Sequence, residues 1–112
     1  MSLSIVAPAT VLIWLGAGCI LGALPLCLQW VPANFIYGIR IAAAFRSEYH
    51  WYAVNRFGGF RLLRFGAITA AMGLALDHYP QAPFWLPILA LVATLPLLLL
   101  TVRAIERYAA SL

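Results

Sequence analysis

The length of the apolar runs is the feature that most constrains the fold of this chain. Two stretches, about residues 5–28 and about residues 84–104, are apolar for long enough to cross a bilayer, because a helix needs about 20 residues to span a hydrocarbon core roughly 30 Å thick. Hydrophobic residues make up 65% of the 112 residues and charged residues 9%, whereas soluble proteins average about 45–50% and about 25%. A soluble domain of this size cannot bury so much apolar surface, so we predict an integral membrane protein.

A third apolar run is too short to cross by itself. Residues 65–76 are uninterrupted by charge, but at 1.5 Å per residue they reach only about 18 Å. They cross a bilayer only as part of a longer helix, which we predict over about residues 47–77, with Ser47 as its N-cap. That extension brings Arg61 and Arg64 into or beside the membrane.

The segment between the first two spans, residues 32–46, is too short to cross. Phe35, Ile36 and Ile39 recur in it at helical spacing, which favours a short interfacial helix or a re-entrant loop. The predicted fold class is therefore all-α, with one membrane domain over residues 1–112. It has three transmembrane helices, and this short segment lies between the first and the second.

The distribution of basic residues predicts the orientation. All seven basic residues are arginines and the formal net charge is +4. A basic soluble protein would suggest nucleic acid as a partner. Membrane topology explains the charge better here, because basic residues collect on the cytoplasmic side of spanning helices. Five arginines lie at residues 40–64, between the first apolar run and the run at residues 65–76, and two lie at the end of the last span, at residues 103 and 107. The connection around residues 77–84 has none. We therefore expect an outside N-terminus, a cytoplasmic C-terminus and no nucleic-acid partner.

Other residue types add little chemistry. No Lys or Arg precedes the first apolar run, so this run is expected to remain as a membrane helix instead of being cleaved as a signal peptide. Cys19 and Cys27 lie in that run and are expected to be small buried hydrophobes. His50 and His78 have no partners at metal-binding spacing. We therefore expect neither a metal nor a cofactor.

Small residues suggest where the helices pack. Gly18 and Gly22 have GxxxG spacing, and Gly66, Ala70 and Gly73 lie along the second span. Such residues let two helix backbones approach closely. They indicate either packing within the chain or a face for dimerisation.

Polar and aromatic residues gather around the short segment and the start of the long helix. Glu48, Trp51 or Tyr52, and Asn55 are spaced three or four residues apart, so they share one side of a helix. Gly38 would supply a turn that places nearby side chains against this helix. The predicted binding residues are Asn34, Tyr37, Gly38, Arg40, Glu48, Trp51, Tyr52, Asn55, Arg56 and Gly59.

Simpler interpretations of the same residues remain open. The aromatic side chains are also what interfacial anchoring requires, and the arginines are also what topology requires. Topology, however, does not call for Asn or Glu. The cluster would also serve a purely structural purpose if Glu48 or Asn55 held Arg40 and so fixed the loop to the helix.

The pattern of these residues resembles a known family. P-x-N-x-x-Y-G-x-R at residues 32–40, an acidic residue about ten positions later, and W-x-x-x-N-R-x-x-G at residues 51–59 are similar to the SdpI/YfhL family of bacterial membrane proteins. The resemblance implies a three-helix unit in the bacterial cytoplasmic (inner) membrane. Its best-known members give immunity against a secreted, membrane-active peptide toxin, and the founding member also holds a repressor at the membrane. Ile41 stands where the family commonly has threonine.

We weigh three functions. The first is an SdpI-like binding or immunity protein, whose cytoplasm-facing polar site engages a lipid headgroup, a peptide toxin or a regulatory protein. The second is an accessory structural subunit of a larger, bioenergetic membrane complex, or a homo-oligomer. The third is a lipid-phosphate enzyme, with arginines on the phosphate and Glu48 or His50 moving protons. The cluster lacks an acidic pair for a divalent ion, so we do not expect an enzyme.

Three charges are expected at membrane depth: Arg61, Arg64 and Glu106. Ionisable groups in this position are costly and tend to be paired. The third helix returns to the same side with the sequence RAIER, so Glu106 is expected to pair with Arg61 or Arg64, or with Arg103 on its own helix. The alternative is that the arginines extend to the headgroups.

Overall fold

The computed structural model describes residues 7–112, and within them it contains helices and no strands. The elements are α1 (Pro8–Cys27), the short 3₁₀ helix η2 (Ala42–Phe45), α2 (Glu48–Asp77) and α3 (Trp85–Ala110). All three long helices are long and apolar enough to cross a membrane. The predicted all-α fold, with three helices long and apolar enough to span a membrane, is confirmed. The segment between the first two, predicted as a short interfacial helix or a re-entrant loop, is irregular except for η2. The expected start of the first span, at residues 5 and 6, lies outside the described residues.

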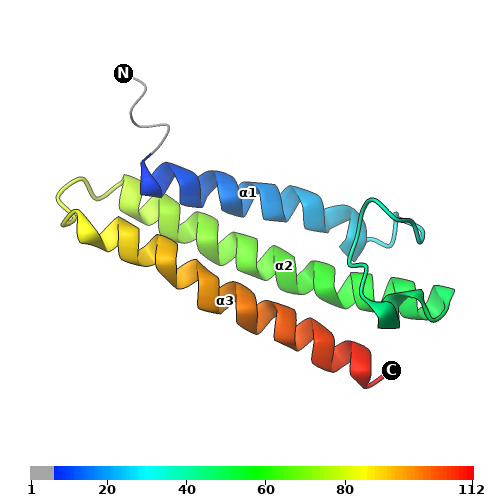
Figure 1. The fold of residues 1–112 in the computed structure, drawn as a ribbon. Helices are drawn as coiled ribbons and strands as arrows, with labels where there is room; N and C mark the ends of the chain where they lie inside the picture. Colours follow the sequence, from blue (N-terminus) through cyan, green and yellow to red (C-terminus); the bar gives the residue numbers. More distant parts are fainter. Residues whose placement is uncertain (1–6) are drawn as a thin grey trace.

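α2 is the central helix of the molecule. Figure 1 shows α1 and α3 on opposite sides of it, and α2 packs along both of them. The described residues measure 51 × 24 × 18 Å, so the molecule is elongated along the helices. The α1–α2 connection, the start of α2 and the C-terminus gather at one end (Figure 1), which we name the strap end.

α1 and α2 pack backbone to backbone. A Cβ added to Gly16 would lie 2.5 Å from the Ala70 nitrogen and from the Gly66 oxygen, and one added to Gly73 would lie 2.8 Å from the Ala9 oxygen. Only small residues permit so close an approach. The part played by Gly66, Ala70 and Gly73 in packing was predictable from the sequence, and Gly16 is the partner on α1.

Gly18 and Gly22 do not take part in this packing. A Cβ added to either would meet no atom within 4 Å. The interpretation of their GxxxG spacing as helix packing within the chain is therefore wrong. Gly16 lies on a different face of α1 from Gly18, and sequence spacing does not reveal which face turns toward α2.

α1 ends in a turn that requires a left-handed residue. The Trp30 N–H donates to the Pro25 carbonyl at 3.0 Å, and the Gln29 N–H donates to the Leu26 carbonyl at 3.2 Å. These two bonds form a Schellman motif, whose left-handed position is usually glycine. Here that position is held by Gln29, with φ of 60°.

α2 begins where the sequence predicts. Ser47 is the N-cap, and its side-chain oxygen accepts from the His50 N–H at 3.1 Å. The Ser47 hydroxyl also lies 2.7 Å from the His50 ring nitrogen Nδ1. Glu48 stands in the first turn, where a negative charge complements the helix dipole.

α3 is longer than the predicted span of residues 84–104, because it continues to Ala110. Ile105 and Ala109 are buried in a core cluster with Trp51 of α2. The Tyr108 ring stacks on the Phe57 ring, with centroids 4.2 Å apart. The apolar run alone gives the shorter span, and packing against the start of α2 accounts for the last two helical turns.

Candidate functional site

Asn55 joins the α1–α2 connection to α2. Its side chain is only 2% exposed. The carboxamide oxygen accepts from the Ile39 N–H at 2.6 Å, and the carboxamide nitrogen donates to the Ile39 carbonyl at 3.3 Å and to the Trp51 carbonyl at 2.9 Å. One amide side chain therefore satisfies both backbone groups of a residue that belongs to no regular element. We call the segment held in this way, residues 31–41, the strap.

Trp51 provides the second attachment, one helical turn before Asn55. It is fully buried, and its indole N–H donates to the Val31 carbonyl at 2.8 Å. Gly38 crosses over both side chains with φ of +119°, and a Cβ there would lie 2.9 Å from the Asn55 oxygen and 3.0 Å from the Trp51 ring. Backbone conformation and space both therefore require glycine at residue 38.

The strap also has bonds of its own and a bond to α1. The Asn34 side-chain oxygen accepts from the N–H groups of Ile36 (2.8 Å) and Tyr37 (2.7 Å). Its nitrogen donates to the carbonyls of Pro32 (2.7 Å) and Tyr37 (3.0 Å), which closes a tight loop. The Tyr37 hydroxyl donates to the Gly22 carbonyl of α1.

Arg40 is not held as the sequence suggested. One alternative interpretation had Glu48 or Asn55 holding the Arg40 side chain, but the Arg40 guanidinium donates to the Phe35 carbonyl within the strap. Asn55 instead binds the backbone of the neighbouring residue, Ile39. The sequence pattern therefore correctly predicts a contact between loop and helix, but not the atoms that make it.

The remaining predicted residues on α2 lie away from the strap. Gly59 faces α1, where an added Cβ would lie 3.0 Å from the Cys27 nitrogen and sulfur. Arg56 is exposed, and its guanidinium lies 5.7 Å from the centre of the Phe60 ring. These two residues contribute to helix packing and to surface charge.

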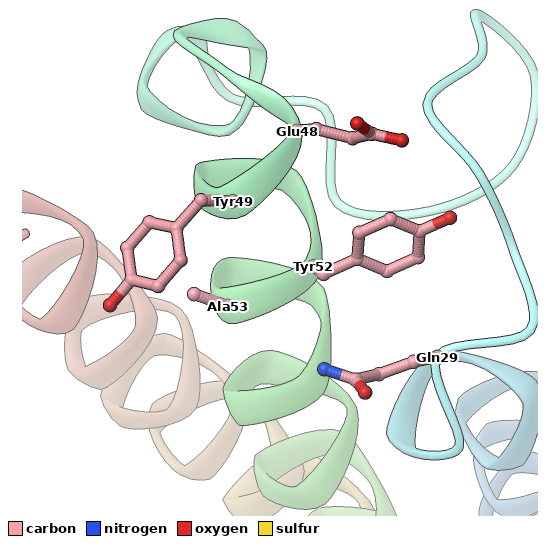
Figure 2. Close-up of a pocket in the computed structure, with 5 residues that line it drawn as sticks. All are labelled: Gln29, Glu48, Tyr49, Tyr52 and Ala53. Atoms are coloured by element: carbon pink, nitrogen blue, oxygen red, sulfur yellow. The ribbon is translucent and has the colours of Figure 1, made fainter.

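A cavity opens beside the strap, at the start of α2. It has a volume of about 460 Å³ and is lined by Gln29, Glu48, Tyr49, Tyr52 and Ala53. Figure 2 shows Glu48 and Tyr52 extending from α2 toward the α1–α2 connection, and Gln29 extending from that connection toward α2, whereas Tyr49 extends to the opposite side of α2. Glu48 and Tyr52 belong to the predicted binding set, and the other three residues do not.

Gln29 is one of the three lining residues outside the predicted set, and its backbone conformation sets it apart. A residue other than glycine in the left-handed region costs roughly 1–2 kcal/mol, and such strain is common where a side chain serves a function. The polar tip of Gln29 is one of the groups at the cavity (Figure 2). No sequence signal marks it, because a left-handed glutamine is visible only from the backbone.

The cavity offers hydrogen bonding and one negative charge. The Glu48 carboxylate, the Gln29 amide and the Tyr52 hydroxyl are suited to a ligand that carries N–H donors or a positive charge. The Tyr52 ring can contact apolar or cationic groups. Over residues 7–112, no three His, Cys, Asp or Glu side chains gather as a metal site would need.

The charges at membrane depth are arranged differently from the prediction. The pairing of Glu106 with Arg61, Arg64 or Arg103 is not formed in the part of the chain that the structure describes. The Arg61 guanidinium lies 5.3 Å from the centre of the Phe57 ring. Arg61 and Arg64 line a second cavity, between α2 and α3.

Comparison with known proteins gives one match. The model of the SdpI/YfhL protein family matches residues 31–102, which include the strap, all of α2 and most of α3. Comparison with curated proteins and with solved structures gave no match. Because the match covers well over half of the chain and contains the residues that hold the strap, the chain belongs to the SdpI/YfhL family.

Proposed function

We propose that this protein has an SdpI-like binding or immunity role, in which it captures a membrane-active peptide and performs no catalysis. The observation that carries the proposal is the cavity beside the strap, with the Glu48 carboxylate at its edge. Family membership supports an immunity-type role. We propose that Glu48, Tyr52 and Gln29 contact the ligand directly, and that Trp51 and Asn55 act by holding the strap.

The chemistry of the cavity indicates a cationic ligand. Glu48 is one of only three acidic residues in a chain of net charge +4, so its position beside Tyr52 is selective for positive charge. Membrane-active peptides are typically amphipathic and rich in Lys or Arg. A Lys or Arg side chain of such a peptide would bind the carboxylate, and its apolar residues would contact the Tyr52 ring.

We further propose that the strap end faces the bacterial cytoplasm. Arg40, Arg46 and Arg56 lie at or near this end, as do Arg103 and Arg107 of α3, whereas the α2–α3 connection has no basic residue. The positive-inside rule then places the strap end in the cytoplasm. On this orientation the cavity lies at the inner leaflet, so the protein engages a peptide that has already inserted.

Toxin tolerance tests the proposal. Bacteria producing the full chain are challenged with a panel of membrane-active peptides that ranges from cationic to neutral, and the minimum inhibitory concentration is measured. We expect the chain to raise this concentration for at least one cationic peptide. Glu48→Gln should abolish the gain, because it removes the charge and keeps the size of the side chain.

Glu106→Gln is the matched control, because it removes an exposed carboxylate that does not line the cavity. It should retain full tolerance at equal membrane abundance. The proposal is rejected if the wild-type chain protects against no peptide of the panel. It is also rejected if Glu48→Gln protects as well as the wild type.

A structural-subunit role is favoured by one other observation. On α1, a Cβ added to Gly18 or Gly22 would meet no atom of residues 7–112 within 4 Å, and Trp14 and Leu21 are 72% and 71% exposed. A neighbouring membrane helix would fit closely against such a face. Extraction in mild detergent distinguishes this role, because an accessory subunit co-purifies with other chains in fixed ratio.

A further inference from the structure

Arg61 and Arg64 lie deeper along α2 than a headgroup position requires. Arg64 precedes the end of α2 at Asp77 by about 13 residues, which is about 20 Å of helix. If Asp77 marks one boundary of a hydrocarbon core about 30 Å thick, a helix along the membrane normal places Arg64 about 10 Å inside the other boundary. Two positive charges at this depth are costly unless a partner of opposite charge compensates them.

The protein itself does not supply that partner. Among residues 7–112, neither guanidinium forms an ion pair with a carboxylate. Arg61 lies over the Phe57 ring, at 5.3 Å from its centre, which leaves its N–H groups free to donate elsewhere. Glu106 is exposed.

The two arginines stand at the edge of a groove whose other residues are mostly apolar. The groove has a volume of about 200 Å³ and lies between α2 and α3; it is lined by Arg61, Arg64, Phe65, Ile68, Leu97, Leu100 and Thr101. Of the four residues from α2, Arg61 lies three and four residues before Arg64 and Phe65, and these lie four and three residues before Ile68, so the four residues share one side of the helix. The hydroxyl of Thr101 is already bonded to the Leu97 carbonyl at 2.9 Å.

The order of the lining residues gives the groove a polar end and an apolar end. Along α2 the two arginines come first, and Phe65 and Ile68 follow toward the middle of the span. α3 runs antiparallel to α2 (Figure 1), so Leu97 lies deeper in the span than Thr101. A ligand that fits both ends has a negative headgroup and a hydrocarbon tail.

We propose that this groove is a binding site for an anionic phospholipid. The lipid phosphate accepts hydrogen bonds from Arg61 and Arg64, since guanidinium groups bind phosphate oxygens in pairs. The first carbons of an acyl chain lie along Phe65, Ile68 and Leu97. Basic pockets between membrane helices are known sites for anionic lipid headgroups.

The shape of the groove favours a lipid over free phosphate. About 200 Å³ accommodates a phosphate and the start of one acyl chain, and the rest of the lipid remains in the bilayer. Free phosphate would leave the apolar part of the groove empty, whereas the acyl chain of a lipid fills it. This inference is independent of the peptide-binding role, because its residues and its cavity are different.

Native mass spectrometry of the full chain, released from nanodiscs that contain equal amounts of phosphatidylglycerol and phosphatidylethanolamine, tests the site. We expect the wild type to retain phosphatidylglycerol selectively. In the double variant Arg61→Gln with Arg64→Gln, the retained phosphatidylglycerol should fall by about tenfold or more, because the variant loses the attraction of two arginines to the anionic headgroup. The matched control is Arg103→Gln with Arg107→Gln, which removes two arginines outside the groove and should retain the lipid.

Two further arms keep the outcome interpretable. Ile68→Trp fills the apolar end and leaves both arginines in place, so it should also reduce retention, even if the double variant fails to fold. Added inorganic phosphate at millimolar concentration should not displace the lipid. The proposal is overturned if the double variant and the wild type retain the lipid equally, or if inorganic phosphate displaces it.

Discussion

At the scale of single residues, the Asn55 side chain supplies hydrogen bonds to backbone groups that a neighbouring strand would supply in a sheet. Its carboxamide pairs with both the N–H and the carbonyl of Ile39, and Gly38 lies against it because no larger residue fits. The polar pattern of this family unit is therefore mainly a device for attaching a loop. Glu48 and Tyr52 are the members of the predicted set that line a cavity.

Replacing Asn55 by Ala tests this attachment. The variant leaves the part-buried backbone groups of Ile39 without their partner, so we expect it to lower the free energy of unfolding by about 2–4 kcal/mol. Unfolding in detergent, followed by circular dichroism, measures the loss. Arg56→Ala, at the adjacent exposed position, should change it by less than about 0.5 kcal/mol. Equal stability of the two variants would contradict the role of Asn55.

At the scale of elements, the hydropathy pattern and cap chemistry predict the helices well. Ser47 is a side-chain cap at the start of α2, as its residue type indicates. The last turns of α3 were missed because they depend on the contact of Ile105 and Ala109 with a core cluster that includes Trp51. A charged sequence such as RAIER predicts exposure, but it says nothing about a partner helix on its apolar side.

Helix packing also gives a paired prediction. Gly16→Ala places a methyl group 2.5 Å from backbone atoms of α2, whereas Gly18→Ala meets nothing within 4 Å. We expect Gly16→Ala to destabilise the protein by about 1–3 kcal/mol, because backbone cannot move aside as a flexible side chain can. Thermal unfolding in detergent should show no loss for Gly18→Ala. A loss from Gly18→Ala that depends on protein concentration would instead indicate that this face joins two chains.

At the scale of the whole molecule, polar chemistry is concentrated at the strap end. The strap, the larger cavity and the C-terminus lie there (Figure 1). The three-helix architecture could be predicted from the lengths of the apolar runs. The cavities could not, because they depend on the left-handed Gln29 and on how side chains of α2 and α3 pack against each other.

Orientation in the membrane is the prediction at this scale. Chains are made with green fluorescent protein or alkaline phosphatase fused after Leu112. Because the arginine-rich end should remain in the cytoplasm, we expect the fluorescent fusion to fluoresce and the phosphatase fusion to be inactive. Fusion of the same reporters within the α2–α3 connection, after Gln81, should give the reverse pattern. An active phosphatase after Leu112 would show the opposite topology, in which the larger cavity lies outside the cytoplasm.

The way in which the strap is held has a consequence for how this unit tolerates sequence change. Asn55 and Trp51 bind main-chain atoms of Ile39 and Val31. These hydrogen bonds therefore do not depend on the identity of the side chains elsewhere in the strap. Phe35 and Ile36 are 83% and 90% exposed. A library that randomises these two positions should therefore still yield folded protein. The exposed residues of the strap can therefore change during evolution while the hydrogen bonds that attach it to α2 stay the same, as is common for surface loops on a rigid scaffold.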